Sequence, residues 1–595
     1  MRHVSSDRMA MERAKKLFED WESAYGLANG SLSPAPALGF PPGVPPAPHL
    51  EDCARRTAAR ARAEERGPNG EAPAWARAGE CCQCRADVPP ANCTPQTPWI
   101  RGPDAASFAL TRVAQRDIWA NQFPAPSDCN RRRLVLTHWP GLHHGLGSQL
   151  HIMSSFLSLA VRFNRTLVVK PESFNRATQA CRDLAIGNNF ECFFFPLGAP
   201  ACLKLALEAE ARGEVVNSDG MKNEEREQVL GSDTPVVQVA NTGLFPEVGA
   251  TDLWGVPSLD RPFTIEQLGK VQGQYLSWGQ ARWWRAQSLR FMLRWPSAYL
   301  CHVINRVRHS AYGLLVADRV ASVVLKQAEL VQALNASATN SPPPPTPQDP
   351  THPPIDLADD VRFLSSSPIS APSSTPSSSL LLSPPPSAAP PPFSPSPPSL
   401  ASHIWSHQGL AGCSTCSAAS TSQPTSPPSP ASSPSRGACT WAASASVYEE
   451  VGAPPFMLRP VISMHVRQGD KGIEMSLHSL ASFIFFAYRL RRHKPDLQYI
   501  WLSSEMESVM AAAESFPDWT FLYASSSRAT DVEQMKQQQF SGQQPVAEIF
   551  ASLLITSESD YFIGSLGSNW NRVIDELRST NGRLFGGMVT LTHGV

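Results

Sequence analysis

The residues best suited to bind a charged ligand form the segment Met464–Lys471, which reads MHVRQGDK. This segment ends an apolar stretch that predicts a strand over residues 461–466, and ligands of open α/β sheets bind at the carboxyl ends of strands. The planar guanidinium of Arg467 could bind a phosphate through two hydrogen bonds, and Lys471 would add a positive charge. A plain strand end with a surface arginine–aspartate pair stays an equal alternative on these residues alone.

A second candidate is the loop Gly564–Arg572, which reads GSLGSNWNR. An apolar strand ends there, small residues turn the chain, and a helix begins. Backbone N–H groups at a helix N-terminus can bind an anion, and Ser568 is a good N-cap residue for such a helix. A glycine- and serine-rich turn before a capped helix, without any ligand, is the simpler alternative.

A third candidate is the loop Gly145–Leu150, which reads GLGSQL and includes Gly147. It is similar to the dinucleotide-binding pattern G-x-G-x-x-G, but Leu150 replaces the third glycine. Lys170 stands where that pattern requires an acidic residue after the next strand, so the pattern is not met. The loop could still face a phosphate or a sugar, and a tight turn without a ligand is equally consistent with it.

Motifs for several other chemistries are absent from the sequence. There is no Asp-x-Asp triplet to hold a metal–diphosphate complex, no P-loop, no H-E-x-x-H motif and no G-x-S-x-G elbow. Cys81 and Cys84 form a C-x-x-C pair, but no second pair follows at zinc-ribbon spacing, so disulfides or an unordered segment are favoured there. The sequence therefore predicts no metal site, and arginine and helix N-termini would have to balance a diphosphate.

Hydrophobic periodicity predicts the strands and helices of the first half of the functional region, residues 131–340. Residues 134–137 and 166–169 are short apolar strands, and the segment between them carries apolar residues on one helical face. These residues are Leu150, Met153, Leu157 and Val161. Strand, glycine-bearing loop, helix and strand make a βαβ unit, and residues 280–335 are expected to be mainly helical.

The second half, residues 455–595, alternates between strands and helices. The expected strands are 461–466, 499–502, 520–523 and 561–564, and the expected helices are 477–492, 504–516, 546–557 and 569–579. This alternation favours a parallel, doubly wound sheet, so the predicted fold class is α/β.

Composition separates ordered from low-complexity regions. The 595 residues include 56 prolines, many of them in residues 341–447, which we expect to be a disordered Pro/Ser-rich insertion; a simple interdomain linker is the alternative. We expect residues 1–130 to be an N-terminal helix with a poorly ordered stem, and residues 131–340 and 455–595 to form the two halves of one functional region. With 51 basic and 52 acidic residues, the chain has no general attraction for nucleic acid or anionic membranes.

Cysteines and glycosylation sequons bear on the compartment. The chain has 13 cysteines, so at least one is unpaired or pairs with another chain, and Asn-x-Ser/Thr sequons occur at Asn29, Asn92, Asn164 and Asn335. These features fit a secretory protein. Neither an apolar run of about 18 residues nor a signal-peptide core is visible. We therefore expect a Golgi or secretory-lumen protein whose N-terminal anchor is missing from this chain.

Taken together, the three loops resemble the α-1,6-fucosyltransferase family and its plant and algal relatives. The family's strand ending in His-Val-Arg, followed by Asp-Lys, a glutamate and a histidine, matches His465, Val466, Arg467, Asp470, Lys471, Glu474 and His478. Its serine-rich loop before a helical arginine resembles Ser565–Arg572. Its Gly-x-Gly-x-Gln-Leu-His loop resembles Gly145–His151, and its Trp-Trp-x-x-Gln helix resembles Trp283, Trp284 and Gln287.

The resemblance implies two facing Rossmann-like domains (GT-B-like), GDP-fucose as donor, no metal, and inversion at the transferred sugar. It implies that Arg467 binds the β-phosphate and that Glu474 is the general base, assisted by Lys471. The donor site is then expected to contain His465, Asp470, Gly145, Gly147, Ser565, Ser568, Asn569 and Arg572. Ser552 stands where the family has an aspartate that contacts the nucleotide.

The acceptor stays open at this point. A glycan hydroxyl, such as the core N-acetylglucosamine of N-glycans, is the first expectation, with a glycan or glycoprotein as partner. A protein hydroxyl or a cell-wall polysaccharide is a second possibility. A third, of another class, is a non-catalytic scaffold or lectin-like protein of fucosyltransferase-like fold. We expect the chain to lack the SH3-like domain of the animal enzymes.

Overall fold

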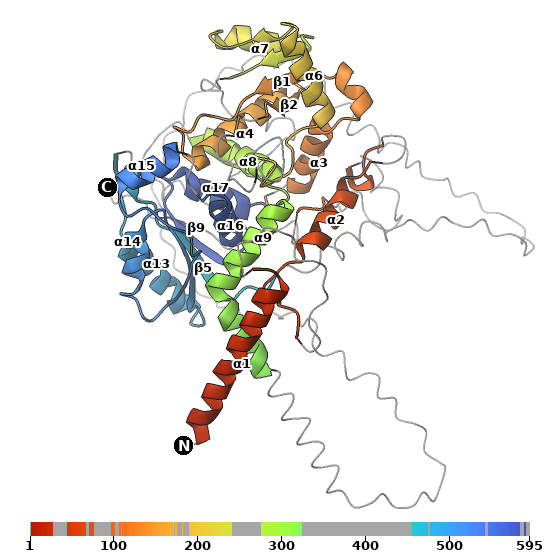
Figure 1. Cartoon of the computed structure of the whole chain (residues 1–595). Helices are drawn as coiled ribbons and strands as arrows, with labels where there is room; N and C mark the ends of the chain where they lie inside the picture. Colours follow the sequence, from red (N-terminus) through yellow and green to blue (C-terminus); the bar gives the residue numbers. More distant parts are fainter. Residues whose placement is uncertain are drawn as a thin grey trace, which may run out of the picture. The chain divides into compact units, whose positions relative to one another are not determined.

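The structure is a computed structural model (Figure 1). It describes residues 2–27, 44–66, 71–76, 97–100, 106–108, 110–171, 173–174, 181, 190–240, 275–323, 455–473, 476–541, 545–583 and 588–590. The described residues up to Ser322 and those from 455 onward belong to one compact unit. They form a mixed α/β structure with two parallel sheets.

The first sheet has the strand order β2-β1-β4-β3, all parallel. Its strands are β1 (Leu134–Thr137), β2 (Thr166–Val169), β3 (Val216–Asn217) and β4 (Val236–Gln238). The helix α4 (Leu146–Arg162) connects β1 to the parallel β2, which confirms the expected βαβ unit. Every residue of β1 and β2 is buried, as expected for a parallel sheet covered by helices, here α4 and α6 (Pro200–Ala211).

The second sheet has the order β7-β6-β5-β8-β9, again all parallel. Its strands are β5 (Val461–His465), β6 (Tyr499–Ser503), β7 (Thr520–Leu522), β8 (Tyr561–Gly564) and β9 (Met588–Thr590). The chain moves from β5 outward to β7 and then crosses to β8 on the other side of β5. The strand order therefore reverses between β5 and β8, which is where doubly wound sheets bind ligands.

The helices of the second half lie close to their expected positions. They are α13 (Leu480–His493), α14 (Glu507–Ala513), α15 (Val532–Phe540), α16 (Val546–Ser557) and α17 (Asn569–Arg578). The bounds of α16 agree with the sequence prediction, and α13 and α14 begin three residues later than predicted. The polar helix α15 was not predicted.

Helices from the first half pack on helices from the second half. In Figure 1, α8 (Tyr275–Met292) lies beside α4 and α17, and α9 (Ala298–Arg308) lies beside α16. At the first of these contacts, the buried Glu576 of α17 accepts hydrogen bonds from His151 of α4 and from Arg285 of α8. The expected helical character of residues 280–335 is confirmed as far as Val323, and the remainder lies outside the described residues.

The region expected to be a poorly ordered stem, residues 31–130, is folded in its described parts. It contains α2 (Cys53–Glu64) and α3 (Thr111–Gln122), and the ring of Trp75 packs edge to face against Trp99 and Trp119, with centroids 5.0 Å apart in each pair. The prediction was wrong here because a few widely spaced aromatic side chains supply the buried surface and leave no periodic pattern among the prolines, alanines and arginines. The C-x-x-C pair at Cys81 and the insertion 341–447 lie outside the described residues.

Three disulfides connect described cysteines, and the sequence alone did not indicate their pairing. They are Cys53–Cys301, Cys129–Cys202 and Cys181–Cys192. The first joins α2 to α9, and thereby fixes the N-terminal region to the main unit. None of the described helices combines the length and the apolarity that a membrane crossing requires.

Candidate functional site

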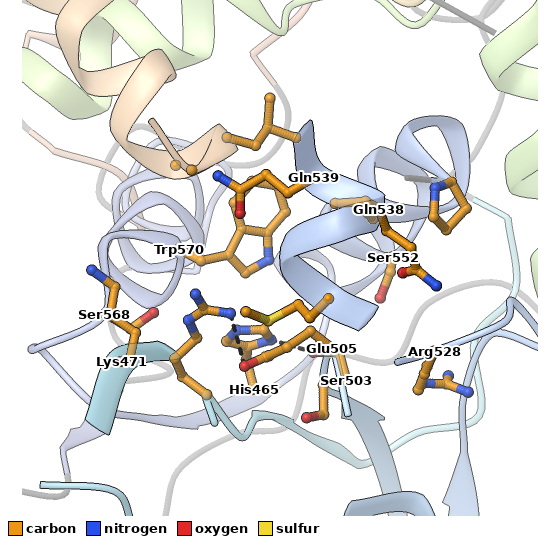
Figure 2. Close-up of a pocket in the computed structure, with 18 of the residues that line it drawn as sticks. His465, Lys471, Ser503, Glu505, Arg528, Gln538, Gln539, Ser552, Ser568 and Trp570 are labelled. Carbon is orange, nitrogen blue, oxygen red and sulfur yellow. Dashed lines mark hydrogen bonds and ion pairs between the residues drawn. The ribbon is translucent and has the colours of Figure 1, made fainter. Parts of the chain in front are cut away.

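A cavity of about 370 Å³ lies where the two halves of the described unit meet (Figure 2). Its wall comes from the carboxyl ends of β5 and β6, the N-terminal turns of α4 and α17, and the helices α15 and α16. The volume falls in the range of roughly 300–1,000 Å³ that is usual for small-molecule sites. Figure 2 places Ser568 and Lys471 on one side of the cavity and Ser552, Gln538 and Arg528 on the other.

Arg467 follows β5, and its guanidinium is held between two carboxylates. One terminal nitrogen lies 2.7 Å from Asp470 Oδ1, and the other lies 2.7 Å from Glu505 Oε1. Glu505 Oε1 also accepts a hydrogen bond of 2.7 Å from the backbone N–H of Gln468. The Arg467 side chain is 18% exposed and lines the cavity. These contacts orient a planar cation toward the cavity while its charge is locally balanced.

His465, the last residue of β5, is buried and neutral. Burial, and secondarily the charge of Arg467, lowers the pKa of His465 to about 3. Its Nδ1 lies 3.1 Å from Ser503 Oγ, and the Ser503 hydroxyl donates to the carbonyl of Met464 at 3.1 Å. Because the Ser503 hydroxyl donates its hydrogen to Met464, it accepts the hydrogen bond from His465. Nδ1 of His465 therefore carries the imidazole proton, and Nε2 is the acceptor.

The acceptor atom of His465 has no partner within the protein. Nε2 is buried and receives no hydrogen bond among the described residues, although His465 lines the cavity. A buried polar atom without a partner is costly, and a ligand donor such as a hydroxyl or N–H group would satisfy it. Figure 2 shows His465 beside Ser503, the last residue of β6.

Two helix N-termini meet at the cavity. A Cβ at Gly147, in the first turn of α4, would lie 3.0 Å from the backbone nitrogen of Trp570 in the first turn of α17. Ser148 Oγ accepts a hydrogen bond of 2.8 Å from Asn569 Nδ2, which joins the same two turns. Each helix N-terminus presents unpaired N–H groups and a partial positive charge, so the pair favours an anion more than either helix does alone.

Most of the residues expected in the donor site line this one cavity. They are His465, Arg467, Asp470, Lys471, Gly145, Gly147, Ser568 and Asn569. Ser568 is the N-cap residue of α17, as predicted, although its hydroxyl makes no capping hydrogen bond. The expected general base, Glu474, lies outside the described residues.

Two expected site residues are placed behind the cavity wall. Ser565 is buried and does not line the cavity. Arg572 does not line it either; its Nε donates to the Leu566 carbonyl at 2.6 Å, and one terminal nitrogen lies 3.3 Å from Asn569 Oδ1. Arg572 therefore braces the loop that carries Ser568, because its guanidinium is turned toward that backbone.

Several residues that line the cavity were not predicted from the sequence to be site residues. They are His143, His144, Glu505, Arg528, Met535, Gln538, Gln539 and Glu548. Gln539 of α15 donates to the Leu142 carbonyl at 3.2 Å, so this helix reaches across to the glycine loop. The sequence could have indicated Glu505 as a site residue, because it follows β6 at the sheet edge that carries Arg467. It could not have indicated the residues of α15, because this helix has no periodic apolar pattern. Within the described residues, no three His, Cys, Asp or Glu side chains are grouped to hold a metal ion.

Comparison with models of known protein families finds no match for this sequence, and comparison with curated proteins finds none either.

Proposed function

We propose that this chain is an inverting, metal-independent glycosyltransferase of GT-B-like architecture that transfers fucose from GDP-fucose to a glycan hydroxyl. The observation that carries the proposal is that Arg467 and Ser568, which come from separate sequence motifs, line one cavity. If the two residues had lain on different faces of the molecule, the motifs would not have formed one donor site. The choice of GDP-fucose comes from the resemblance of these motifs to the α-1,6-fucosyltransferase family.

The charges around the cavity suit a diphosphate. Arg467 and Lys471 are cations in its lining, and the N-termini of α4 and α17 add two partial positive charges at one place. Asp470 and Glu505 hold Arg467 in the free protein. The Arg467 guanidinium has N–H groups that Asp470 and Glu505 do not use. An incoming phosphate would accept hydrogen bonds from these groups, because the planar guanidinium can contact the carboxylates and the phosphate at the same time.

The proposed reaction is one displacement at the anomeric carbon of fucose. A bond forms between the acceptor oxygen and that carbon, the bond to the β-phosphate oxygen breaks, and the acceptor proton passes to a general base. The negative charge that develops on the leaving GDP is stabilised by Arg467, Lys471 and the helix N-termini, in place of a metal. The proposed general base is Glu474. This role comes from the family resemblance, in which a glutamate follows the position of Lys471 in the sequence.

The proposed compartment is the lumen of the Golgi or secretory pathway. Disulfides persist in oxidising compartments, and Cys53–Cys301, Cys129–Cys202 and Cys181–Cys192 are paired within the described residues. That setting suits a glycan or glycoprotein acceptor.

The first test is calorimetry of GDP binding to the full chain without added metal. The wild-type protein is expected to bind GDP with a Kd in the micromolar range, about −8 kcal/mol. Arg467→Ala should weaken binding at least about tenfold, since it removes a charge-assisted contact to phosphate. Arg489→Ala is the control, because Arg489 is an exposed arginine of α13 that does not line the cavity.

A folded wild-type protein that binds no GDP would reject the proposed function. GDP binding without release of GDP from GDP-fucose, in a screen of glycan and polysaccharide acceptors, would favour a non-catalytic binder of the same donor. Transfer of radiolabelled fucose to one acceptor, lost in Arg467→Ala and kept in Arg489→Ala, would support the enzyme.

A further inference from the structure

One Asn-x-Ser/Thr sequon, Asn164–Thr166, lies in the described part of the chain, and the other three lie outside it. It connects α4 to β2, and Asn164 takes the left-handed backbone conformation, with a φ of 50°. The Asn164 N–H donates to the Val161 carbonyl at 3.1 Å, and the Arg165 N–H donates to the Ala160 carbonyl at 2.8 Å. These two bonds end α4 as a Schellman motif, a position that asparagine tolerates better than most residues.

The Asn164 side chain is held through its oxygen. Oδ1 accepts hydrogen bonds of 3.4 Å from Asn121 Nδ2 and from Arg132 Nη1. Because a guanidinium can only donate, the atom that faces Arg132 must be the amide oxygen. The amide nitrogen Nδ2 therefore points the other way; it donates no hydrogen bond to the described residues, and it is not buried. The atom to which an N-linked glycan is attached is thus open to solvent in the folded protein.

Thr166, the third residue of the sequon, is the first residue of β2 and is fully buried. Its hydroxyl donates to the Asn121 carbonyl at 2.8 Å, and Arg165 beside it is buried as well. An enzyme that recognises the sequon must reach the threonine hydroxyl, so it cannot act on the folded chain. Asn164 would therefore be modified while the chain is still unfolded, before β2 pairs with β1.

The sequon and the cavity lie at opposite ends of α4. The first turn of this helix lines the cavity with Gly147 and Ser148, and Asn164 follows its last turn. The helix has 17 residues, and at roughly 1.5 Å per residue its two ends are about 25 Å apart. A glycan on Asn164 would therefore leave the cavity open to a nucleotide and an acceptor.

We infer that Asn164 carries an N-linked glycan. This inference rests on the secretory compartment of the proposed function, where a phosphate-linked oligosaccharide serves as the glycan donor. In the attachment step a bond forms between Nδ2 and the anomeric carbon of the oligosaccharide, and the bond from that carbon to the phosphate oxygen breaks. The phosphate leaves, and Nδ2 loses one proton. Oδ1 keeps its contacts with Asn121 and Arg132 after folding, because the linkage uses only the nitrogen.

The test is to produce the full chain behind a cleavable secretion signal in a eukaryotic host, with Asn29, Asn92 and Asn335 replaced by glutamine. Enzymatic release of an N-linked glycan converts its asparagine to aspartate, so peptide mass spectrometry measures the occupancy of Asn164. Most molecules are expected to be occupied, in the cell-associated chain as well as in the secreted one, because the modification precedes folding.

Three variants of that chain test the site itself. Asn164→Asp removes the acceptor nitrogen but keeps a residue that tolerates the left-handed conformation, and it should carry no glycan. Thr166→Ser keeps the hydroxyl that the sequon requires and should stay occupied, whereas Thr166→Val removes the hydroxyl and should not be modified. Because occupancy is decided before folding, a loss of stability in Thr166→Val does not affect this measurement.

An unmodified Asn164 in chains whose secretion signal has been cleaved would overturn the inference, because the cleavage shows that the chain entered the secretory lumen. GDP binding by the same chains separates this result from the proposed function. The Kd for GDP should agree within about twofold before and after release of the glycan, since the two sites are about 25 Å apart. A chain that is glycosylated at Asn164 but binds no GDP would keep the inference and reject the proposed function.

Discussion

Gly147 and Trp570 belong to different halves of the chain, and their backbones are in contact: a Cβ built on Gly147 would lie 3.0 Å from the Trp570 nitrogen and 3.1 Å from the Asn569 carbonyl carbon. Those atoms are backbone at the start of α17, so they cannot move aside as a flexible side chain would. The absence of a side chain at Gly147 is therefore what lets the N-termini of α4 and α17 share one anion site.

Gly147→Ala should weaken GDP binding by forcing the two helix N-termini apart. We expect a loss of about tenfold or more, because misplacing charged donors by a few tenths of an ångström weakens several contacts at once. Calorimetry with GDP measures this effect. Gly231→Ala is the control, because Gly231 ends α7 (Asn223–Gly231), does not line the cavity, and an added Cβ there would only touch the Phe163 ring at 4.0 Å. Equal binding by both variants would show that the contact does not shape the site.

The buried His465 should make the protein less stable in acid. Its pKa is lowered from 6.5 to about 3 in the folded state, so between these pH values the unfolded chain binds the proton and the folded chain does not. The stabilising contribution is therefore complete above pH 6.5 and is lost as the pH falls toward 3, at up to about 1.4 kcal/mol per pH unit for one proton. His49 and His309, with pKa values lowered by burial to about 3 and about 4, act in the same direction.

His465→Asn should reduce this pH dependence by one proton. Urea denaturation between pH 7.5 and 4.5 would show a shallower fall in the free energy of unfolding than in the wild-type protein. Gln498→Asn, at an exposed position just before β6, changes no titratable group; it is the control and should leave the slope unchanged. If the two variants gave the same slope, His465 would not be the buried neutral group described here.

The sequence predicted the parts of the site that follow directly from strand ends. His465 and Arg467 come at the end of an apolar strand, and Ser568 begins the helix after another, so their meeting at one sheet edge follows from a parallel fold. Chain direction alone could not show which side of each turn faces the cavity, and Ser565 and Arg572 were accordingly expected in the lining but lie behind it.

The remaining lining residues depend on tertiary packing that leaves no local signal. Glu548 lies in a correctly predicted helix, but its exposure to the cavity depends on how α16 packs against α9. Gln538 and Gln539 belong to a polar helix without an apolar face, so no period marks them. The folded parts of residues 44–130 were missed for a related reason, because contacts such as Trp75 with Trp99 join residues far apart in the sequence.

Glu576 is expected to be a main electrostatic contact between the halves. Burial by itself would raise the pKa of Glu576, but His151 and Arg285 hold the pKa below its usual value. Glu576→Gln should lower the free energy of unfolding by about 3 kcal/mol, because it leaves two partly buried partners without their counter-charge at a buried contact. Glu227→Gln, which breaks the exposed pair with Arg162, should cost about 0–1 kcal/mol. Urea denaturation of both variants makes the comparison, and similar losses would contradict it.

The disulfide Cys53–Cys301 should stabilise the whole unit, since it joins residues 248 apart and fixes α2 to α9. Replacing both cysteines with alanine should lower the free energy of unfolding by about 2–5 kcal/mol, because the unfolded chain regains the freedom that the crosslink removes. The variant's thermal midpoint should lie below that of the oxidised wild-type protein. The matching double replacement of Cys181 and Cys192 opens a loop of only 11 residues and should cost less on this model. Equal shifts in the two variants would mean that the local packing of α2, and not chain entropy, sets the effect.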